Sequence, residues 1–255
     1  MLLVIDIGNT SIAFGIFEGQ TLRATWHVAT DIHRMADEYA VLIIGLLFQQ
    51  NLRMSDINDA IISSVVPPLT TLFENLCHRY LGVSPLIVGP GVKTGVRICM
   101  DNPREVGADR IANAAAAHHL YGGPVIVIDF GTATTVDAVS KEGDYLGGAI
   151  APGIEIAADA LFERAAKLPR VELVPPENAI GKNTVSAMQS GIIFGYVGLI
   201  EGIVARIRQE LGVNATVVAT GGLANIIARE TPVIDEVNPN LNIEGLRLIH
   251  EMNRR

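Results

Sequence analysis

Short apolar runs separated by polar corners occupy the start of the chain, and this pattern predicts strands. Residues 2–5 and 12–17 are apolar and rich in β-branched side chains, and residues 21–29 follow a Glu-Gly-Gln turn. Runs of this length bounded by Gly, Asn and Asp are typical of strands in a meander. Residues 31–50 then show the apolar spacing of an amphipathic helix.

The next segments add two further strands and two helices. Residues 60–66 predict a strand that stops at Pro67-Pro68, residues 69–81 a helix, and residues 85–88 another short strand. The alanine-rich residues 104–121 predict a long helix, which Gly122-Gly123-Pro124 ends. A strand meander followed by alternating helices and strands describes an α/β unit, a mixed sheet with helices on its faces.

The same order of elements restarts near residue 125. Strands are predicted at 125–128, 134–140, 145–150 and 215–220, and helices at 153–167, 184–211 and 241–255. Asp6 and Asp129 each follow a four-residue apolar strand and precede a turn into a second strand. This repetition indicates duplication of a whole unit. We therefore predict two lobes, residues 1–112 and 113–255, with a cleft between them where ligands commonly bind.

The repeated aspartate hairpins are candidate phosphate sites. A tight turn exposes backbone N–H groups that can bind an anion, and Gly8 allows close approach of the ligand. Asp6 can hold a hydrated Mg2+ against the same phosphates. Further donors in the two turns are Asn9, Thr10 and Ser11, then Gly131, Thr132 and Thr134. An ordinary β-turn uses the same residue types, but two copies, each after an apolar strand, favour phosphate binding.

Charge and hydropathy narrow the possible partners. The net charge is −8 without a basic stripe, so duplex nucleic acid is not an expected partner. The apolar run 40–48 is too short to cross a bilayer, and Met1 leads directly into a strand. We therefore expect a cytoplasmic protein with no membrane contact.

Other common site motifs do not fit this sequence. Cys77 and Cys99 form no CxxC pair and imply no disulfide framework. Gly181-Lys182 is followed by Asn183 and lacks the earlier glycine of a Walker A loop, and there is no GxGxxG. A phosphate site in this chain would therefore depend on the aspartate hairpins.

The paired D-[IF]-G-[NT] hairpins resemble those of the superfamily of acetate and sugar kinases, Hsp70 and actin. Within it the chain resembles type III pantothenate kinases. The supporting stretches are "DIGNTSIAFGIF", "NPREVGADRIANAAAA", "VIDFGTATTVDAV", "GGAIAPG", "GKNTVSAMQSG", "TGGLA" and "NPNLNIEGL", in the family's order from residue 2 to about 250. The expected fold is two duplicated ribonuclease H-like (actin-like) lobes.

The resemblance implies an ATP-dependent kinase that converts pantothenate to 4′-phosphopantothenate, the first step of coenzyme A biosynthesis. Asp109 would be the general base, Asp6 would hold Mg2+ through water, and Asp129 would hold a monovalent cation, K+ or NH4+. The implied ATP-binding residues are Asp6, Ile7, Gly8, Asn9, Thr10, Ser11, Ile12, Ala13 and Thr132. The implied substrate-binding residues are Met100, Gly107, Ala108, Asp109, Arg110 and Thr184. The family implies a homodimer with the substrate site at the interface.

Several alternatives stay open at the level of sequence. Asp109 and Arg110 could form a surface ion pair, and Thr184 is equally a candidate helix N-cap. Met100 stands where the family usually has an aromatic residue, which removes a hydroxyl donor from the substrate site. Some relatives are described as accessory factors for transcription, which gives a non-catalytic alternative. An actin- or Hsp70-like ATPase would need subdomains for which 255 residues leave no room.

Overall fold

The computed structural model describes residues 1–254, and its internal contacts divide the chain into two units. Unit 1 comprises Met1–Val96, Asp101–Ala116 and the C-terminal segment from Leu241, and unit 2 comprises Arg97–Met100 and Ala117–Asn240. The predicted division at residue 112 differs from this one chiefly because the C-terminal helix packs on the N-terminal sheet. Each unit is built around its own sheet.

The sheet of unit 1 has the strand order β3-β2-β1-β4-β5. Its strands are β1 (Leu2–Ile7), β2 (Ser11–Glu18), β3 (Thr21–Ala29), β4 (Asp59–Ser64) and β5 (Leu86–Ile87). The first three strands form an antiparallel meander, β4 lies parallel to β1, and β5 lies parallel to β4. The crossover helices are α1 (Ala36–Gln49) and α2 (Pro67–Leu76), which continues as a π-helical turn at Cys77–Leu81.

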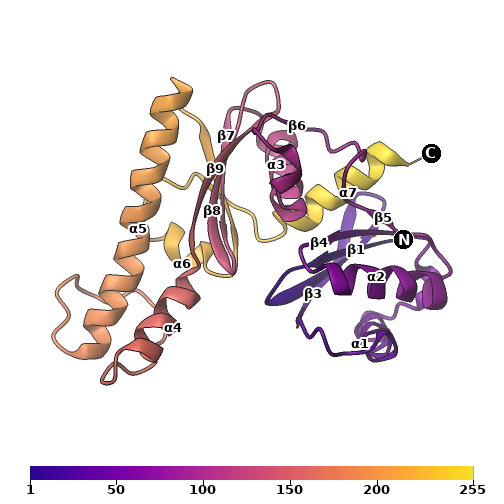
Figure 1. The fold of residues 1–255 in the computed structure, drawn as a ribbon, viewed down its shortest axis with the longest axis horizontal. Coiled ribbons are helices and arrows are strands. Elements are labelled where there is room, and N and C mark those ends of the chain that lie inside the picture. Colours follow the sequence, from indigo (N-terminus) through magenta and orange to yellow (C-terminus); the bar gives the residue numbers. More distant parts are fainter. Residues whose placement is uncertain (255) are drawn as a thin grey trace. The chain divides into compact units, whose positions relative to one another are not determined.

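Helices cover both faces of this sheet. Figure 1 shows α1 and α2 on one face and α7 (Leu241–Asn253) on the other. Successive side chains of a strand point to opposite faces. Leu3, Ile5 and Ile7 therefore pack with α1 and α2. Leu2 and Val4 pack with α7 and with α3 (Ala108–Tyr121). By this alternation Asp6 points to the face that carries α3 and α7.

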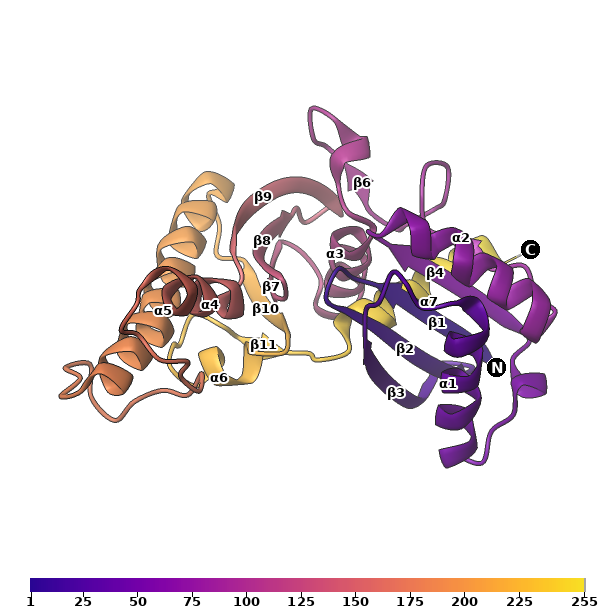
Figure 2. The same cartoon turned by 60° about the horizontal axis from the view of Figure 1, so that its bottom comes forward.

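Unit 2 repeats this topology. Its strands are β7 (Val125–Phe130), β8 (Ala133–Val139), β9 (Asp144–Pro152), β10 (Thr216–Gly221) and β11 (Glu236–Val237). The sheet order is β11-β10-β7-β8-β9-β6, so β6 (Arg97–Ile98) is added at the outer edge of β9. Figure 2 shows β9 curving strongly along its length. The predicted duplication of an α/β unit with a mixed sheet is confirmed by the matching strand orders.

The core of unit 2 lies between the sheet and α5 (Thr184–Leu211). Ile193, Ile200 and Val204 of this helix are fully buried, in one cluster with Ile126 and Ile128 of β7. The other helices are α4 (Ile154–Arg164) and α6 (Ala224–Ala228). Within residues 1–254, α5 alone has the length and hydropathy to cross a membrane, and 39% of its most apolar window is buried in the unit. Core helices of soluble proteins pass the same test.

Candidate functional site

The first aspartate hairpin is a rigid turn between β1 and β2. The backbone N–H of Gly8 donates to the Ser11 carbonyl at 3.0 Å. Thr30, just after β3, donates its hydroxyl to the Gly8 carbonyl at 2.7 Å and its backbone N–H to the Thr10 carbonyl at 3.0 Å. Asp6 was expected after the strand, but β1 continues to Ile7, so Asp6 lies within the strand. Its backbone is therefore held in the sheet.

Asp109 lies in the first turn of α3, where a carboxylate interacts favourably with the helix dipole. Its Oδ1 accepts a hydrogen bond from the backbone N–H of Arg110 at 2.8 Å. Its carbonyl oxygen accepts from Asn242 Nδ2 of α7 at 3.2 Å. A Cβ on Gly107 would overlap Asp109 Oδ1, so a side chain at position 107 would displace the carboxylate from this position.

Unit 1 brings this turn of α3 to the same edge of the sheet as the hairpin. Ala112 of α3 packs with Val4 of β1 in one buried cluster, so α3 covers the face to which Asp6 points. The segment after β4 contacts both the end of β1 and the residue that precedes α3. Val65 of this segment donates its N–H to the Ile7 carbonyl at 3.0 Å and lies beside Gly107. The carboxyl ends of β1 and β4 and the N-terminus of α3 therefore meet at one edge. Such edges of α/β sheets commonly bind ligands.

The second aspartate hairpin, in unit 2, is held from a different direction. Gly153, at the start of α4, donates its N–H to the Thr132 carbonyl at 3.2 Å, and a Cβ there would overlap that oxygen. Tyr196 of α5 donates its hydroxyl to the Pro152 carbonyl at 2.7 Å. Burial raises the pKa of Tyr196, which keeps this hydroxyl protonated as a donor. "GGAIAPG" therefore braces the hairpin through backbone contacts.

Asp129 lies over the turn of this hairpin. A Cβ built on Gly131 would be 3.5 Å from Asp129 Oδ1. Within residues 1–254, no three His, Cys, Asp or Glu side chains are grouped to hold a metal ion by themselves. A Mg2+ ion that keeps most of its waters needs only one or two carboxylates together with phosphate oxygens. The single aspartate of each hairpin meets that requirement. One aspartate is also enough for a weakly held monovalent cation.

Met100 is the last residue of the segment Arg97–Met100, which comes from the first half of the chain but belongs to unit 2. Its Cγ would be 3.9 Å from a Cβ on Gly147 of β9. Arg97 ties this segment to β9 by a two-pronged ion pair with Asp144, with both N···O distances at 2.7 Å. The Arg97 guanidinium lowers the pKa of the Asp144 carboxyl. Met100 is therefore placed by strand pairing that the sequence pattern did not reveal.

Thr184 is the first residue of α5 and is exposed. The alternative that Thr184 is the helix N-cap is wrong, because Asn183 has that role. Asn183 Oδ1 accepts from the Ser186 N–H at 2.9 Å, and Ser186 Oγ accepts in return from the Asn183 N–H at 3.3 Å. The Thr184 hydroxyl is therefore not required to cap α5.

A groove of about 880 Å3 in unit 2 runs between α4 and α5 past Thr184. Leu161 of α4 and Met188 and Ile192 of α5 contribute its apolar wall, and Lys182 its charged end. The groove places Thr184 beside a partly exposed apolar surface.

The structure divides the predicted residues between the two units. Unit 1 places the Asp6–Ala13 hairpin with Gly107, Ala108, Asp109 and Arg110. Unit 2 contains Met100, Asp129, Thr132 and Thr184. The sequence pattern missed Thr30, which binds Gly8 of the first turn from 22 residues away, and Tyr196, which binds Pro152 beside the second hairpin from 44 residues away. A lone Thr or Tyr at such a separation gives no local signal.

Comparison with known proteins identifies the family. The profile of the family described as type III pantothenate kinase matches residues 2–206. A type III pantothenate kinase of Moorella thermoacetica is 56% identical over 253 residues, which are 99% of this chain and 100% of that protein.

Solved structures show a more distant likeness in fold. A protein of Campylobacter jejuni assigned to the Baf family of transcriptional activators has a TM-score of 0.63 and 20% identity, over 98% of both chains. The inorganic polyphosphate/ATP-glucomannokinase of an Arthrobacter species has a TM-score of 0.50 and 14% identity, over 99% of both chains. The expected fold shared with the sugar kinases is confirmed. The profile match and the full-length identity together show that the chain belongs to the type III pantothenate kinase family.

Proposed function

We propose that this protein transfers the γ-phosphate of ATP to the hydroxyl group of pantothenate that becomes 4′-phosphopantothenate, the first step of coenzyme A biosynthesis. The full-length identity to a type III pantothenate kinase is the observation that carries this proposal. The geometry supports it, because Asp109 lies in the first turn of α3, and α3 packs on the sheet face to which Asp6 points.

The two hairpins bind the nucleotide phosphates in this proposal. Residues 6–13 and the Thr132 hydroxyl contact ATP, although the Gly8 N–H is already used by the Ser11 carbonyl. Asp6 holds Mg2+ through water, and Asp129 holds K+ or NH4+. Cations held there would neutralise charge on the transferred phosphoryl group, and positioning with charge stabilisation is most of what catalysis of this reaction requires. The rigid anchoring of both turns supports this assignment, since preorganised donors need no rearrangement during the reaction.

Asp109 is the proposed general base. It accepts the proton of the attacking hydroxyl while Arg110 and the backbone of Gly107 and Ala108 hold the substrate. A base must reach its proton within hydrogen-bonding distance. The contact of Asp109 with its own helix N-terminus supports this role, because that hydrogen bond fixes the orientation of the carboxylate. Met100 supplies an adaptable apolar wall in place of an aromatic residue.

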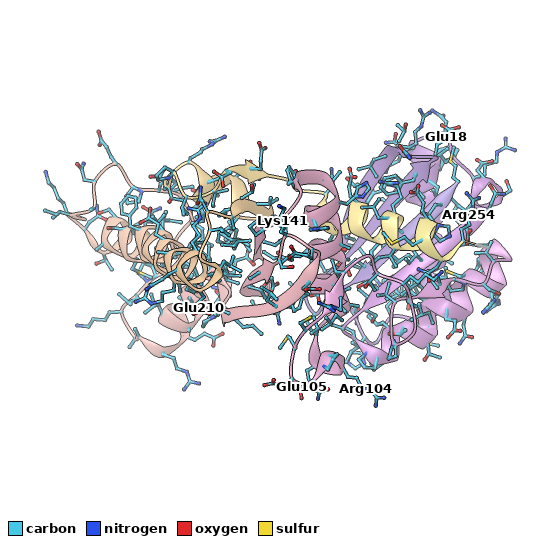
Figure 3. All side chains as sticks on the ribbon, turned by 90° about the horizontal axis from the view of Figure 1, so that it is seen from above. Glu18, Arg104, Glu105, Lys141, Glu210 and Arg254 are labelled. Carbon is cyan, nitrogen blue, oxygen red and sulfur yellow. The ribbon has the colours of Figure 1, made fainter. Side chains whose placement is uncertain are left out.

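A coupled assay of ADP release tests the proposal. With pantothenate, Mg2+ and K+, the wild-type protein turns over, and Asp109→Asn lowers kcat by about 10²–10⁴-fold. Glu105→Gln is the matched control. Figure 3 labels Arg104 and Glu105, which are exposed and lie on the 3-10 turn before α3. ADP release that does not depend on pantothenate, or full turnover by Asp109→Asn, would contradict the proposal. The same assay without K+ tests whether turnover requires the monovalent cation proposed at Asp129.

A regulatory role is the alternative. The fold shared with a Baf family protein is the observation that favours it. The net charge of −8 opposes direct DNA binding, since phosphate contacts need Lys and Arg. Retention on DNA at physiological salt by a protein without kinase activity would support the alternative.

We further propose that the protein acts in the cytoplasm as a homodimer whose substrate site includes Thr184 of the partner subunit. Partly exposed apolar side chains on α4 and α5 support this assembly, namely Ile156, Leu161, Phe162 and Val185. Leu161 lines the groove that contains Thr184, Ile156 and Phe162 belong to the same helix as Leu161, and Val185 follows Thr184 on α5. A second copy would cover apolar surface that a monomer leaves in water.

A further inference from the structure

Ser63, near the end of β4, has a buried hydroxyl beside the Asp6 hairpin. β4 is parallel to β1, and Ser63 pairs in register with Asp6, so both side chains point to the same face of the sheet. Ser63 is fully buried, and within residues 1–254 its Oγ has no hydrogen-bond partner. The first turn of α3, with Asp109, covers that face at the same edge.

A buried hydroxyl without a hydrogen-bond partner destabilises the folded protein. Such a group therefore calls for an explanation, for example a partner that it gains when a ligand binds. The fold itself does not use this group. The neighbouring Ser64 accepts from the Val66 N–H at 3.1 Å and donates to the Val66 carbonyl at 3.2 Å, which closes the turn after β4. Ser63 makes no such bond, and an alanine would fill nearly the same space. A role in ligand binding explains a serine here better than a role in folding.

The duplicated topology gives an independent observation. In unit 2, β10 is the counterpart of β4, and Thr220 of β10 pairs in register with Asp129 of β7. Thr220 is also buried, with 4% of its surface exposed. Each unit therefore places a hydroxyl-bearing residue directly beside its hairpin aspartate, on the neighbouring parallel strand.

We propose that Ser63 is a positioning residue for the phosphate site, and that Thr220 has the same relation to Asp129. When Mg2+ and nucleotide are bound, the Ser63 hydroxyl donates a hydrogen bond to the Asp6 carboxylate and fixes its orientation toward the hydrated cation. Rotation about χ1 carries the hydroxyl between staggered positions, so no backbone movement is needed. This inference depends on the proposed role of Asp6 in holding Mg2+.

The test compares Ser63→Ala, Ser63→Thr and Ser64→Ala with the wild type. Calorimetry of Mg·ADP binding, without pantothenate, and the Mg2+ concentration for half-maximal turnover are measured for each. Ser63→Ala weakens Mg·ADP binding and raises the half-maximal Mg2+ concentration about tenfold, as expected for loss of one hydrogen bond to a charged group. Ser63→Thr, which copies the residue of the other unit, stays within about twofold of the wild type.

Stability separates positioning from a structural role. Ser63→Ala without ligand unfolds at the same temperature as the wild type or higher, because it removes an unsatisfied hydroxyl. Ser64→Ala unfolds at a lower temperature but keeps the Mg2+ dependence of the wild type. Unchanged Mg·ADP binding and Mg2+ dependence in Ser63→Ala would overturn the inference. Absence of pantothenate-dependent turnover in the wild type would instead overturn the proposed function, and the calorimetric comparison would still decide the role of Ser63.

Discussion

At the scale of single residues, the position of the Asp109 carboxylate depends on the absence of a side chain at Gly107. The space that a side chain on Gly107 would need is occupied by Asp109 Oδ1. The same carboxylate oxygen accepts a hydrogen bond from the helix N-terminus. A side chain at position 107 would therefore move the carboxylate before it disturbed the packing of α3.

Gly107→Ala accordingly lowers kcat of pantothenate phosphorylation by about 10–100-fold, because a displacement of about 1 Å is enough to lose that much rate. The thermal unfolding midpoint changes little in comparison. Gly89→Ala is the matched control, since a Cβ there meets no atom within 4 Å. Steady-state kinetics with a melting curve measure both effects. Equal kcat in the two variants would show that the carboxylate is not held as the structure indicates.

The sequence predicted the residue types of the site better than their contacts. Asp6 and Asp129 stand out because the motif occurs twice. The partners that hold the turns, Thr30 and Tyr196, are single residues of common types, and only the fold brings them to the hairpins. Ser63 gives no local signal either, since its place beside Asp6 depends on the pairing of β1 with β4.

At the scale of elements, the sequence predicts the long periodic segments and misses some of the short ones, although the short strand β5 was predicted at residues 85–88. The bounds of β3 and α5 were predicted correctly, because each has a long apolar pattern with clear ends. β6 and β11 have two residues each, and a strand of that length is defined by its neighbour rather than by its own pattern. The helix predicted from residue 104 begins at Ala108, after a 3-10 turn at Pro103–Glu105.

The N-terminus of α5 gives a prediction at this scale. Asn183→Ala removes the cap that Ser186 completes, and it destabilises the protein by about 1 kcal/mol. For a protein of this size that corresponds to a fall of roughly 2–4 °C in the unfolding midpoint. Lys182→Ala, an exposed neighbour outside the cap, serves as the control. Differential scanning calorimetry measures both variants. A midpoint equal to that of the control would contradict the capping role of Asn183.

At the scale of the whole molecule, duplication accounts for the shared strand order of the two units. Both sheets place an antiparallel meander first and a parallel strand beside its first member. The repeat was visible in the sequence, but the return of α7 to the first sheet was not. Amphipathic periodicity shows that a C-terminal helix has an apolar face. It cannot show that Ile243, Leu246 and Ile249 pack with Val4.

The proposed homodimer supplies the prediction that belongs to the assembled protein. Leu161→Glu places a charge on the groove between α4 and α5, where its burial by a second copy would be unfavourable. We expect the variant to elute at the monomer mass of 27.2 kDa in light scattering and to show a raised KM for pantothenate. Ile44→Glu is the matched control, since Ile44 on α1 is 46% exposed and Leu161 is 41% exposed. If Ile44→Glu dissociates the dimer and Leu161→Glu does not, the subunits meet through α1. In that case Thr184 cannot reach the partner's substrate through this groove.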